Sequence, residues 1–198
     1  MKRKNLLLGL ALLGLIVSPA SAQILTNGSF ESGLTGWSTF NASSASITPA
    51  VPYSNQNGTN VAQFPAASSA GLTQFFTLTP NTDYTFSALV AGDVVGDDSV
   101  IRFLLGDSTF GIAVIDQRQF QISATTVGTA MTGINYSFNS GIVTAAGLQI
   151  DSFSIGGTAR VIYLDNVVIT PVAAAPEPGT LLLLTLGSTF VVVRRKRN

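Results

Sequence analysis

Two carboxylates far apart in the sequence, Glu31 and Asp165, make the first candidate site of this 198-residue chain. Asp165 lies in an apolar run with Tyr163, Val167 and Ile169. If those three side chains face the core of a strand, period-two alternation directs Asp165 the same way, and Glu31 takes a similar place in the expected first strand. An ionised carboxylate in an apolar interior must be compensated, because leaving it unpaired costs several kcal/mol.

Calcium is the compensating partner that this pair predicts. Ca²⁺ is a hard cation that takes about six to eight oxygen ligands, so two carboxylates and nearby backbone carbonyls suit it. We therefore expect a structural Ca²⁺ bound by Glu31 and Asp165. The alternative is that one carboxylate accepts backbone N–H bonds or an arginine and no metal binds. Asp97 and Asp98 are interpreted as turn residues and not as ligands.

Sugar binding would need exposed aromatic rings, because the C–H face of a sugar packs on a ring while its hydroxyl groups seek hydrogen bonds. Tyr53, in a Pro-rich loop, and Trp37, the only tryptophan, are the candidates. The other three tyrosines fall in strand-like segments and are expected in the core.

Composition excludes several classes of function. The chain has no cysteine and no histidine, which removes disulfides, thiol nucleophiles, common zinc sites and Ser-His relays. Paired carboxylates could cleave glycosides only in a formed cleft, and no pair is marked by spacing, so we expect no enzyme. Seven of the ten basic residues lie at the two ends, which leaves three arginines against nine acids in the middle, a net charge of about −6 (3 − 9). Nucleic-acid binding needs a basic surface and is not expected.

The elements that position these residues are β-strands. The middle of the chain is rich in Ser, Thr, Gly, Asn and β-branched residues, with no long helical periodicity. Phe120 and Ile122 alternate with Gln119 and Gln121, as in a half-buried antiparallel strand. About eight such strands, separated by turn signals, predict an all-β fold of two packed antiparallel sheets over residues 23–172.

The N-terminal residues 1–22 have the three parts of a secretory signal peptide. Basic residues at positions 2–4 precede an apolar run at 6–17, and small residues at Ala20 and Ala22 are those that signal peptidase reads. We expect cleavage after Ala22. The alternative, a permanent anchor, is disfavoured because about 12 helical residues reach only about 18 Å.

The C-terminal residues 173–198 contain Pro176-Glu177-Pro178, a short apolar run at 181–193 and four basic residues at 194–197. The basic end stays in the cytoplasm while the signal exports the domain, so the tripeptide lies at the outer membrane face. This arrangement resembles the PEP-CTERM sorting tails of Gram-negative bacteria. The resemblance implies recognition by an exosortase, cleavage near the tripeptide and release to the envelope or extracellular matrix. An ordinary C-terminal anchor is the alternative.

Three segments of the middle resemble carbohydrate-binding-module jelly rolls. They are Leu25 to Trp37, with Asn-Gly-Ser-Phe-Glu and Gly-Trp, then Leu72 to Phe86, and the closing Ile162-Tyr-Leu-Asp-Asn-Val-Val-Ile169. The resemblance implies a jelly roll with a core tryptophan, and a calcium held by the residues that match Glu31 and Asp165.

Together these features predict an exported, non-catalytic protein. An N-terminal signal helix and a short C-terminal transmembrane helix flank its β-sandwich, and signal peptidase and exosortase process it. The inner membrane holds it transiently, and exopolysaccharide is its expected ligand. A structural matrix protein without a dedicated sugar site is the alternative.

Overall fold

The computed structural model describes residues 23–40, 45–49, 53–66, 70–93, 95, 99–108, 114–126, 129–154 and 160–173. The expected signal helix, with Ala20 and Ala22, and the C-terminal helix, with Pro176, Glu177 and Pro178, lie outside these ranges. In the described part of the chain no helix has the length and hydropathy needed to cross a bilayer.

All regular elements of the described residues are β-strands, as the sequence predicts. The ten strands are β1 (Ser38–Phe40), β2 (Ser46–Pro49), β3 (Asn60–Phe64), β4 (Ala70–Thr77), β5 (Asp83–Gly92), β6 (Ser99–Asp107), β7 (Val114–Ile122), β8 (Thr132–Asn139), β9 (Ala145–Ser154) and β10 (Ile162–Pro171). The sequence pattern predicts about eight. The two shortest, β1 and β2, form sheet edges, where little periodicity is available to detect them.

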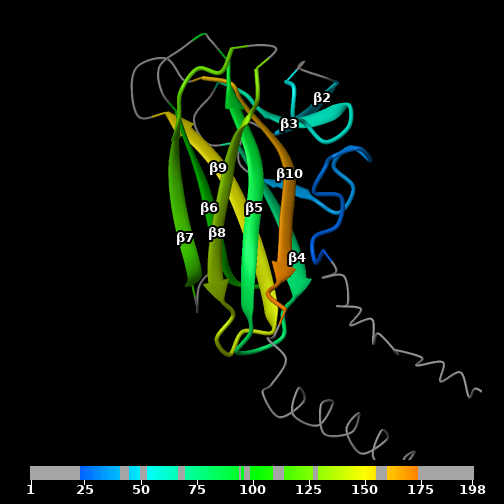
Figure 1. Cartoon of the computed structure of the whole chain (residues 1–198), viewed down its shortest axis with the longest axis vertical. Helices are drawn as coiled ribbons and strands as arrows, with labels where there is room; N and C mark the ends of the chain where they lie inside the picture. Colours follow the sequence, from blue (N-terminus) through cyan, green and yellow to red (C-terminus); the bar gives the residue numbers. More distant parts are fainter. Residues whose placement is uncertain are drawn as a thin grey trace, which may run out of the picture.

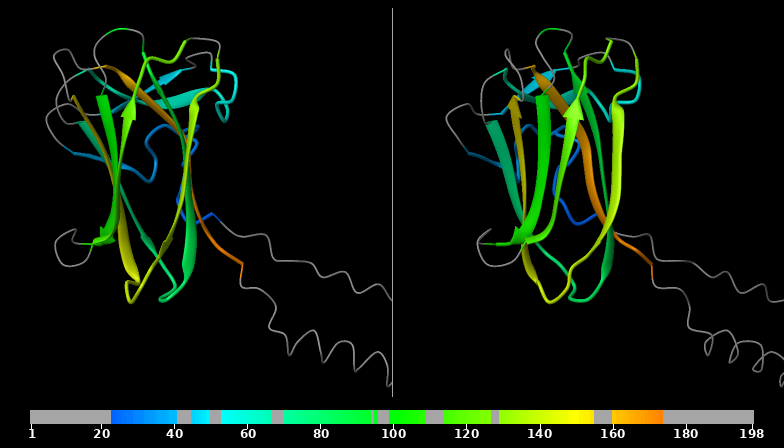
Figure 2. Two further views of the ribbon diagram at one scale, coloured as in Figure 1. Left: turned by 60° about the vertical axis from the view of Figure 1, so that its left-hand side comes forward. Right: turned by 90° about the vertical axis from the view of Figure 1, so that its left-hand side faces the viewer.

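The strands form two five-stranded antiparallel sheets that pack face to face as a jelly-roll sandwich (Figures 1 and 2). Sheet A has the order β1-β4-β9-β6-β7, and sheet B has the order β2-β3-β10-β5-β8. Each sheet thus joins strands that are distant in the sequence. The first described strand β1 lies at an edge of sheet A, whereas the C-terminal strand β10 lies in the middle of sheet B between β3 and β5.

The core between the sheets follows the expected alternation. On β8, Ile134 and Phe138 are buried against the other sheet, while Asn135 and Ser137 face solvent. The apolar runs at 100–105 and 161–169 predict strands β6 and β10 covered on both faces, but only their inward-facing side chains are fully buried. On the outer faces, Arg102 of β6 and Tyr163 of β10 are partly exposed. The edge strands β7 of sheet A and β8 of sheet B contact each other through Arg118 and Tyr136. The guanidinium carbon of Arg118 lies 5.4 Å from the centroid of the Tyr136 ring.

The segment around Glu31 differs from the prediction, because it forms turns and not a strand. Asn27 and Phe30 adopt positive φ angles of 51° and 58°, which end any extended conformation. The Asn27 side chain organises the loop: its Nδ2 donates to the Gly33 and Thr35 carbonyls at 2.9 and 3.1 Å, and its Oδ1 accepts from the Ser32 N–H. Local side-chain hydrogen bonds therefore replace strand pairing here.

The predicted alternation in β10 is interrupted by a register shift between Asp165 and Val168. Asn166 has a φ of 48° at this irregularity. Tyr163 consequently lies on the outer face of sheet B, while Val167 and Ile169, beyond the shift, are buried. The expectation that Tyr163 shares a core-facing side with Val167 and Ile169 is wrong, because simple period-two counting cannot see a bulge.

Candidate functional site

Glu31 and Asp165 are brought to the same loop, residues 57–60. The Glu31 Oε1 accepts N–H bonds from Thr59 at 2.9 Å and Asn60 at 2.7 Å, and its Oε2 accepts the Thr59 hydroxyl at 3.1 Å. The Asp165 oxygens accept the Asn57 N–H at 2.5 Å and that of the next residue in β10, position 166, at 2.6 Å. The pair therefore fastens the β2–β3 connection to both the N-terminal loop and the last strand.

The two carboxylates differ in electrostatic character. Asp165 is fully buried, and burial raises its pKa to about 6, against the opposing effect of the N–H bonds from Asn57 and Asn166; the Glu31 charge raises it further. Glu31 is exposed, and the N–H bond from Asn60 holds its pKa below the usual value. The negative charge of Glu31 thus acts on a neighbour that already resists ionisation.

The donor set fits a cation in part. Two carboxylates bond to one loop, whereas Arg102 and Arg118 pair with Asp151 and Asp116, and Arg160 donates to the main-chain carbonyl of Asp93. On the other side, all four carboxylate oxygens already accept at least one N–H or O–H bond. In the described residues no third acidic side chain joins the pair.

Trp37 lies in the core and offers no ring face to a ligand. Only 7% of its surface is exposed, its ring centroid lies 5.5 Å from that of Phe30, and its Nε1 donates to the Asn27 carbonyl at 3.1 Å. The ring thus fixes the N-terminal loop against sheet A, in agreement with the core position that the family resemblance implies.

Tyr53 is also buried, although the sequence predicts an exposed loop contact. It is 4% exposed and packs over the outer face of sheet B, 6.0 Å from the Tyr163 ring and beside Met131 and Ala91. Asn55 holds this arrangement, because its side chain donates to the Met131 carbonyl and accepts the Met131 N–H, at 3.1 and 2.6 Å. Residues 53–60 therefore form a strap over sheet B, defined here as the sheet B strap.

The outer face of sheet A carries a row of polar side chains that the sequence does not single out. Register places Gly71, Asp151, Arg102 and Gln119 opposite one another on β4, β9, β6 and β7. The next row contains Thr73, Gln149, Leu104 and Gln117. We call this surface the sheet A face; its members used below are Phe40, Arg102, Gln119, Gln149, Asp151 and Phe153.

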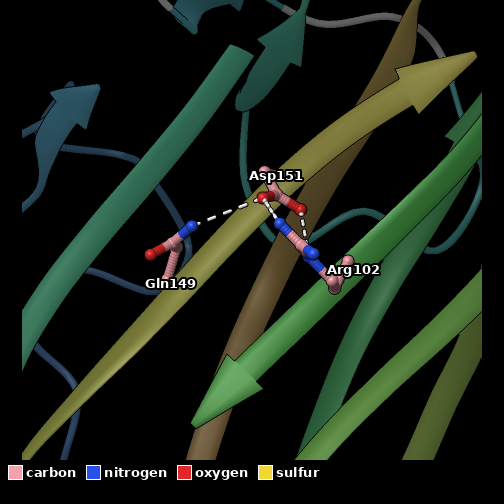
Figure 3. A network of polar contacts seen from close by, with 3 residues as sticks. All are labelled: Arg102, Gln149 and Asp151. Carbon is pink, nitrogen blue, oxygen red and sulfur yellow. Dashed lines mark hydrogen bonds and ion pairs between the residues drawn. The ribbon is translucent and has the colours of Figure 1, made fainter. Parts of the chain in front are cut away.

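Arg102 is held in place at the centre of the sheet A face (Figure 3). Its Nε donates to the Asp151 Oδ1 at 2.9 Å and its Nη2 to the Oδ2, a two-pronged ion pair that raises the Arg102 pKa. Gln149 donates to the same Oδ2 at 3.3 Å, and the guanidinium carbon lies 5.8 Å from the Phe153 ring centroid. Asp151 is 5% exposed, whereas the Arg102 side chain is 31% exposed, so the guanidinium is presented to solvent.

Phe40 adds an aromatic ring to one end of this row. It pairs with Gly71, and a Cβ at position 71 would lie 2.0 Å from the ring Cζ. The ring is half-buried, and it can cover the strand only because residue 71 is a glycine.

Two sequence signals could have located this face. The alternation of Gln119 and Gln121 with Phe120 and Ile122 shows amide side chains pointing away from the core, and Arg102 is one of only three arginines in the domain. The partner Asp151 carries no such signal, because its pairing depends on which strands are neighbours.

The two-sheet antiparallel jelly roll has the fold of carbohydrate-binding modules. The family model described as a carbohydrate binding domain matches residues 22–154, and the chain belongs to this family. A second model, the PEP-CTERM protein-sorting motif, matches residues 174–197 and shows a sorting tail of an exported protein.

Solved structures share the fold at low sequence identity. TmCBM61 in complex with β-1,4-galactotriose has a TM-score of 0.60 and 18% identity, covering 77% of this chain and 100% of that one. The CBM22-1 xylan-binding domain from Paenibacillus barcinonensis Xyn10C has a TM-score of 0.54 and 18% identity, covering 80% and 99%. The family 16 carbohydrate binding module-2 has a TM-score of 0.54 and 18% identity, covering 74% and 99%. A search of curated protein sequences finds no match.

Proposed function

We propose that the domain binds polysaccharide on the sheet A face, without catalysis, after export and sorting through its C-terminal tail. The observation that carries this proposal is the fixed Arg102–Asp151 pair, placed among outward-facing amides in a carbohydrate-binding fold. Amide groups both donate and accept hydrogen bonds, as sugar hydroxyl groups do. The exposed Arg102 adds N–H donors held in one orientation, and this lowers the entropy lost on binding.

Sheet A is favoured over sheet B because their outer faces differ in access. The sheet B strap covers the outer face of β10 and β5 near Tyr163, and its own loop bonds hold it there. On the sheet A face, Gln119 and Gln117 are exposed and Gln149 is half-buried. A polymer chain lying across the strands of sheet A would meet Phe40 on β1, Gln149 on β9, Arg102 on β6 and Gln119 on β7. On β4, Phe75 is 57% exposed on the same face.

Variants of residues 23–173 test this assignment by calorimetry and on a glycan array. Gln119→Ala and Arg102→Met should each weaken binding about tenfold, since a hydrogen bond to a charged or amide group contributes about 1 to 2 kcal/mol. Asn135→Ala, an exposed amide on β8 of sheet B, is the matched control and should bind like the parent. No binding of the parent at millimolar glycan would refute the function, while equal losses in all three variants would refute the site.

The producing cell's own exopolysaccharide is the ligand we propose, with the envelope or extracellular matrix of a Gram-negative bacterium as the location. The sorting motif supports this, because it fits processing by an exosortase after signal peptidase has acted, with the inner membrane as a transient anchor. Deletion of residues 174–198 should leave the domain outside its normal location while its glycan affinity is retained. Binding to foreign glycans but not to the producer's polymer would contradict this part of the proposal.

The alternative function is a structural matrix protein with no dedicated sugar site. The burial of Trp37 and Tyr53 favours it, because strong sugar sites usually stack on exposed aromatic rings. The glycan titration above separates the two functions.

We further propose that Glu31 and Asp165 hold Ca²⁺ as a structural ion. The two like charges at the 57–60 loop support it, and the competing arrangement is the set of backbone N–H bonds and one hydroxyl bond that the four carboxylate oxygens accept. In that role Ca²⁺ would supply the positive charge that offsets both carboxylates. Calcium should raise the melting temperature of the EDTA-treated protein, and Asp165→Asn should abolish the rise; identical midpoints in EDTA and in Ca²⁺ would refute the site.

A further inference from the structure

Both ends of the described domain leave the sandwich at the same end. The Ile24 N–H donates to the Ile169 carbonyl at 3.0 Å, near the end of β10. The Val172 N–H donates to the Asp83 carbonyl at 2.8 Å, at the start of β5. This end also carries the β4–β5 and β8–β9 turns and lies at the bottom in Figures 1 and 2. We call it the tail end of the sandwich.

Exposed apolar side chains gather at the tail end. Of the five large hydrophobic residues described as exposed, three lie there: Ile142 in the β8–β9 turn at 87%, Val114 at the start of β7 at 59%, and Val172 after β10 at 49%. The fourth, Phe75 on β4, is 57% exposed and lies on sheet A in the same register row as Val114. Val95 is at the opposite end, between β5 and β6, and is 67% exposed. Folding does not account for Ile142, because almost none of its surface is buried.

The turn that presents Ile142 is held by hydrogen bonds. The Ser140 hydroxyl donates to the Thr79 carbonyl at 2.7 Å and accepts the Thr82 N–H at 3.0 Å, which joins the β8–β9 and β4–β5 turns. The Val143 N–H donates to the Ser140 carbonyl at 3.1 Å and closes the turn itself. Gly141, with a φ of +54°, supplies the left-handed residue that this turn requires. Ile142 is therefore fixed in an outward position.

The length of chain beyond the tail end limits how far it can be from a membrane. Seven residues, and hence eight Cα-to-Cα steps, separate Ala173 from Leu181, where the apolar run of the sorting tail begins. Fully extended, they span at most about 26 to 29 Å. While the tail is anchored, Ile142 therefore faces the outer surface of the bilayer from a short distance.

We propose that the tail end rests on the lipid bilayer before the tail is cleaved, with Ile142 inserted at the boundary of headgroups and acyl chains. The partner is a lipid surface, and the contact is apolar. The two turns, 78–82 and 140–144, and residues 170–173 contain no charged residue. The charges beside them at this end are acidic, among them Asp83 at the start of β5 and Asp107 at the end of β6, so attraction to anionic headgroups contributes nothing. The contact orients the domain, with Val95 and the opposite end facing away from the membrane.

The tether makes such a small contact effective. One isoleucine gives little affinity to a protein in solution, but a short linker converts the contact into an intramolecular step at high effective concentration. Cleavage of the tail removes that advantage. The same contact that orients the anchored protein would then not retain the released domain.

The chain contains no cysteine, so a single introduced thiol can report the contact in the full-length protein. Thr144→Cys places an environment-sensitive fluorophore on an exposed residue beside Ile142, and Val95→Cys places it at the opposite end. Each protein is reconstituted into phosphatidylcholine vesicles that carry lipid-bound nitroxide quenchers. The fluorophore at position 144 should be quenched about fivefold more than that at position 95, and salt should not change this.

Ile142→Asp in the Thr144→Cys background should abolish the excess quenching while the melting temperature stays near that of the parent, since Ile142 packs against nothing. Equal quenching at positions 144 and 95, or quenching at 144 that survives Ile142→Asp, would overturn the proposal. Quenching at position 144 that appears only when a second protein is added would also overturn the proposal. The same holds if the full-length protein does not float with the vesicles.

Discussion

The pH dependence of the metal-free protein is set mainly by Asp165. Burial raises its pKa from the ordinary value of 3.8 to about 6. A carboxyl whose pKa is higher in the folded state binds a proton more tightly there, so ionising it opposes folding. Stability should therefore fall as pH rises from about 4 through 6. Because one pKa unit corresponds to about 1.4 kcal/mol, the loss can reach about 3 kcal/mol.

Urea unfolding in EDTA at several pH values between 5 and 8 measures this slope. The parent should be more stable at pH 5 than at pH 8. Asp165→Asn should flatten the profile, because its side chain cannot ionise. Burial also raises the pKa of Asp93 in the same direction, so the test is the difference between the two profiles. In Ca²⁺ the slope should reverse, because the metal binds the ionised form.

A parent profile that is flat or rises between pH 5 and 8 in EDTA would refute the reasoning about Asp165. So would a variant that keeps the full slope. Glu31 does not contribute to the change in stability between pH 5 and 8. Its pKa is lowered, so its contribution to stability is lost only below about pH 4.5, as pH falls.

Three further predictions follow from single contacts. Gly58→Ala should destabilise the fold by about 2 kcal/mol or more in urea unfolding, because its φ is +96° and the new Cβ would lie 2.4 Å from the Glu31 Cδ; an unchanged midpoint would contradict the packing of Glu31. Saturating glycan should leave the fluorescence of the single tryptophan, Trp37, unchanged because it is buried, and a spectral shift would place the ligand near the N-terminal loop. Asp151→Asn should lower the free energy of unfolding by about 1 to 3 kcal/mol and add affinity for anionic glycans, because it leaves the Arg102 charge uncompensated. If the variant binds no uronate-containing glycan on the array, the Arg102 guanidinium is not accessible to ligand.

Much of the fold could be predicted because the long strands carry their pattern in sequence. The alternation around Phe120 and Ile134 identified β7 and β8, and the apolar runs at 100–105 and 161–169 identified β6 and β10 as strands, although their outer faces are only partly covered. The loop at Glu31 could not be predicted by the same rule. Its conformation depends on positive φ angles and on the hydrogen bonds of one side chain, Asn27, which leave no period.

The candidate sites show the same division. The sequence predicts Glu31 and Asp165 as ligands of one calcium ion, which stays a prediction. The N–H donors of residues 57–60 that bond to both carboxylates come from a segment with no sequence signal. Tyr53 was predicted as a loop contact because loops are usually exposed, but this loop folds back over sheet B. The Arg102–Asp151 pair depends on β6 lying beside β9, a neighbour relation that sequence order does not reveal.

The central claim is that glycan binds across the outer face of sheet A. Titration of the ¹⁵N-labelled domain with the producer's polysaccharide fragments, followed by NMR, tests it most directly. Binding on this face should shift the side-chain signals of Gln119, Gln149 and Arg102 together and leave that of Asn135 unchanged. Shifts confined to sheet B and its strap, or no shifts at millimolar ligand, would contradict it.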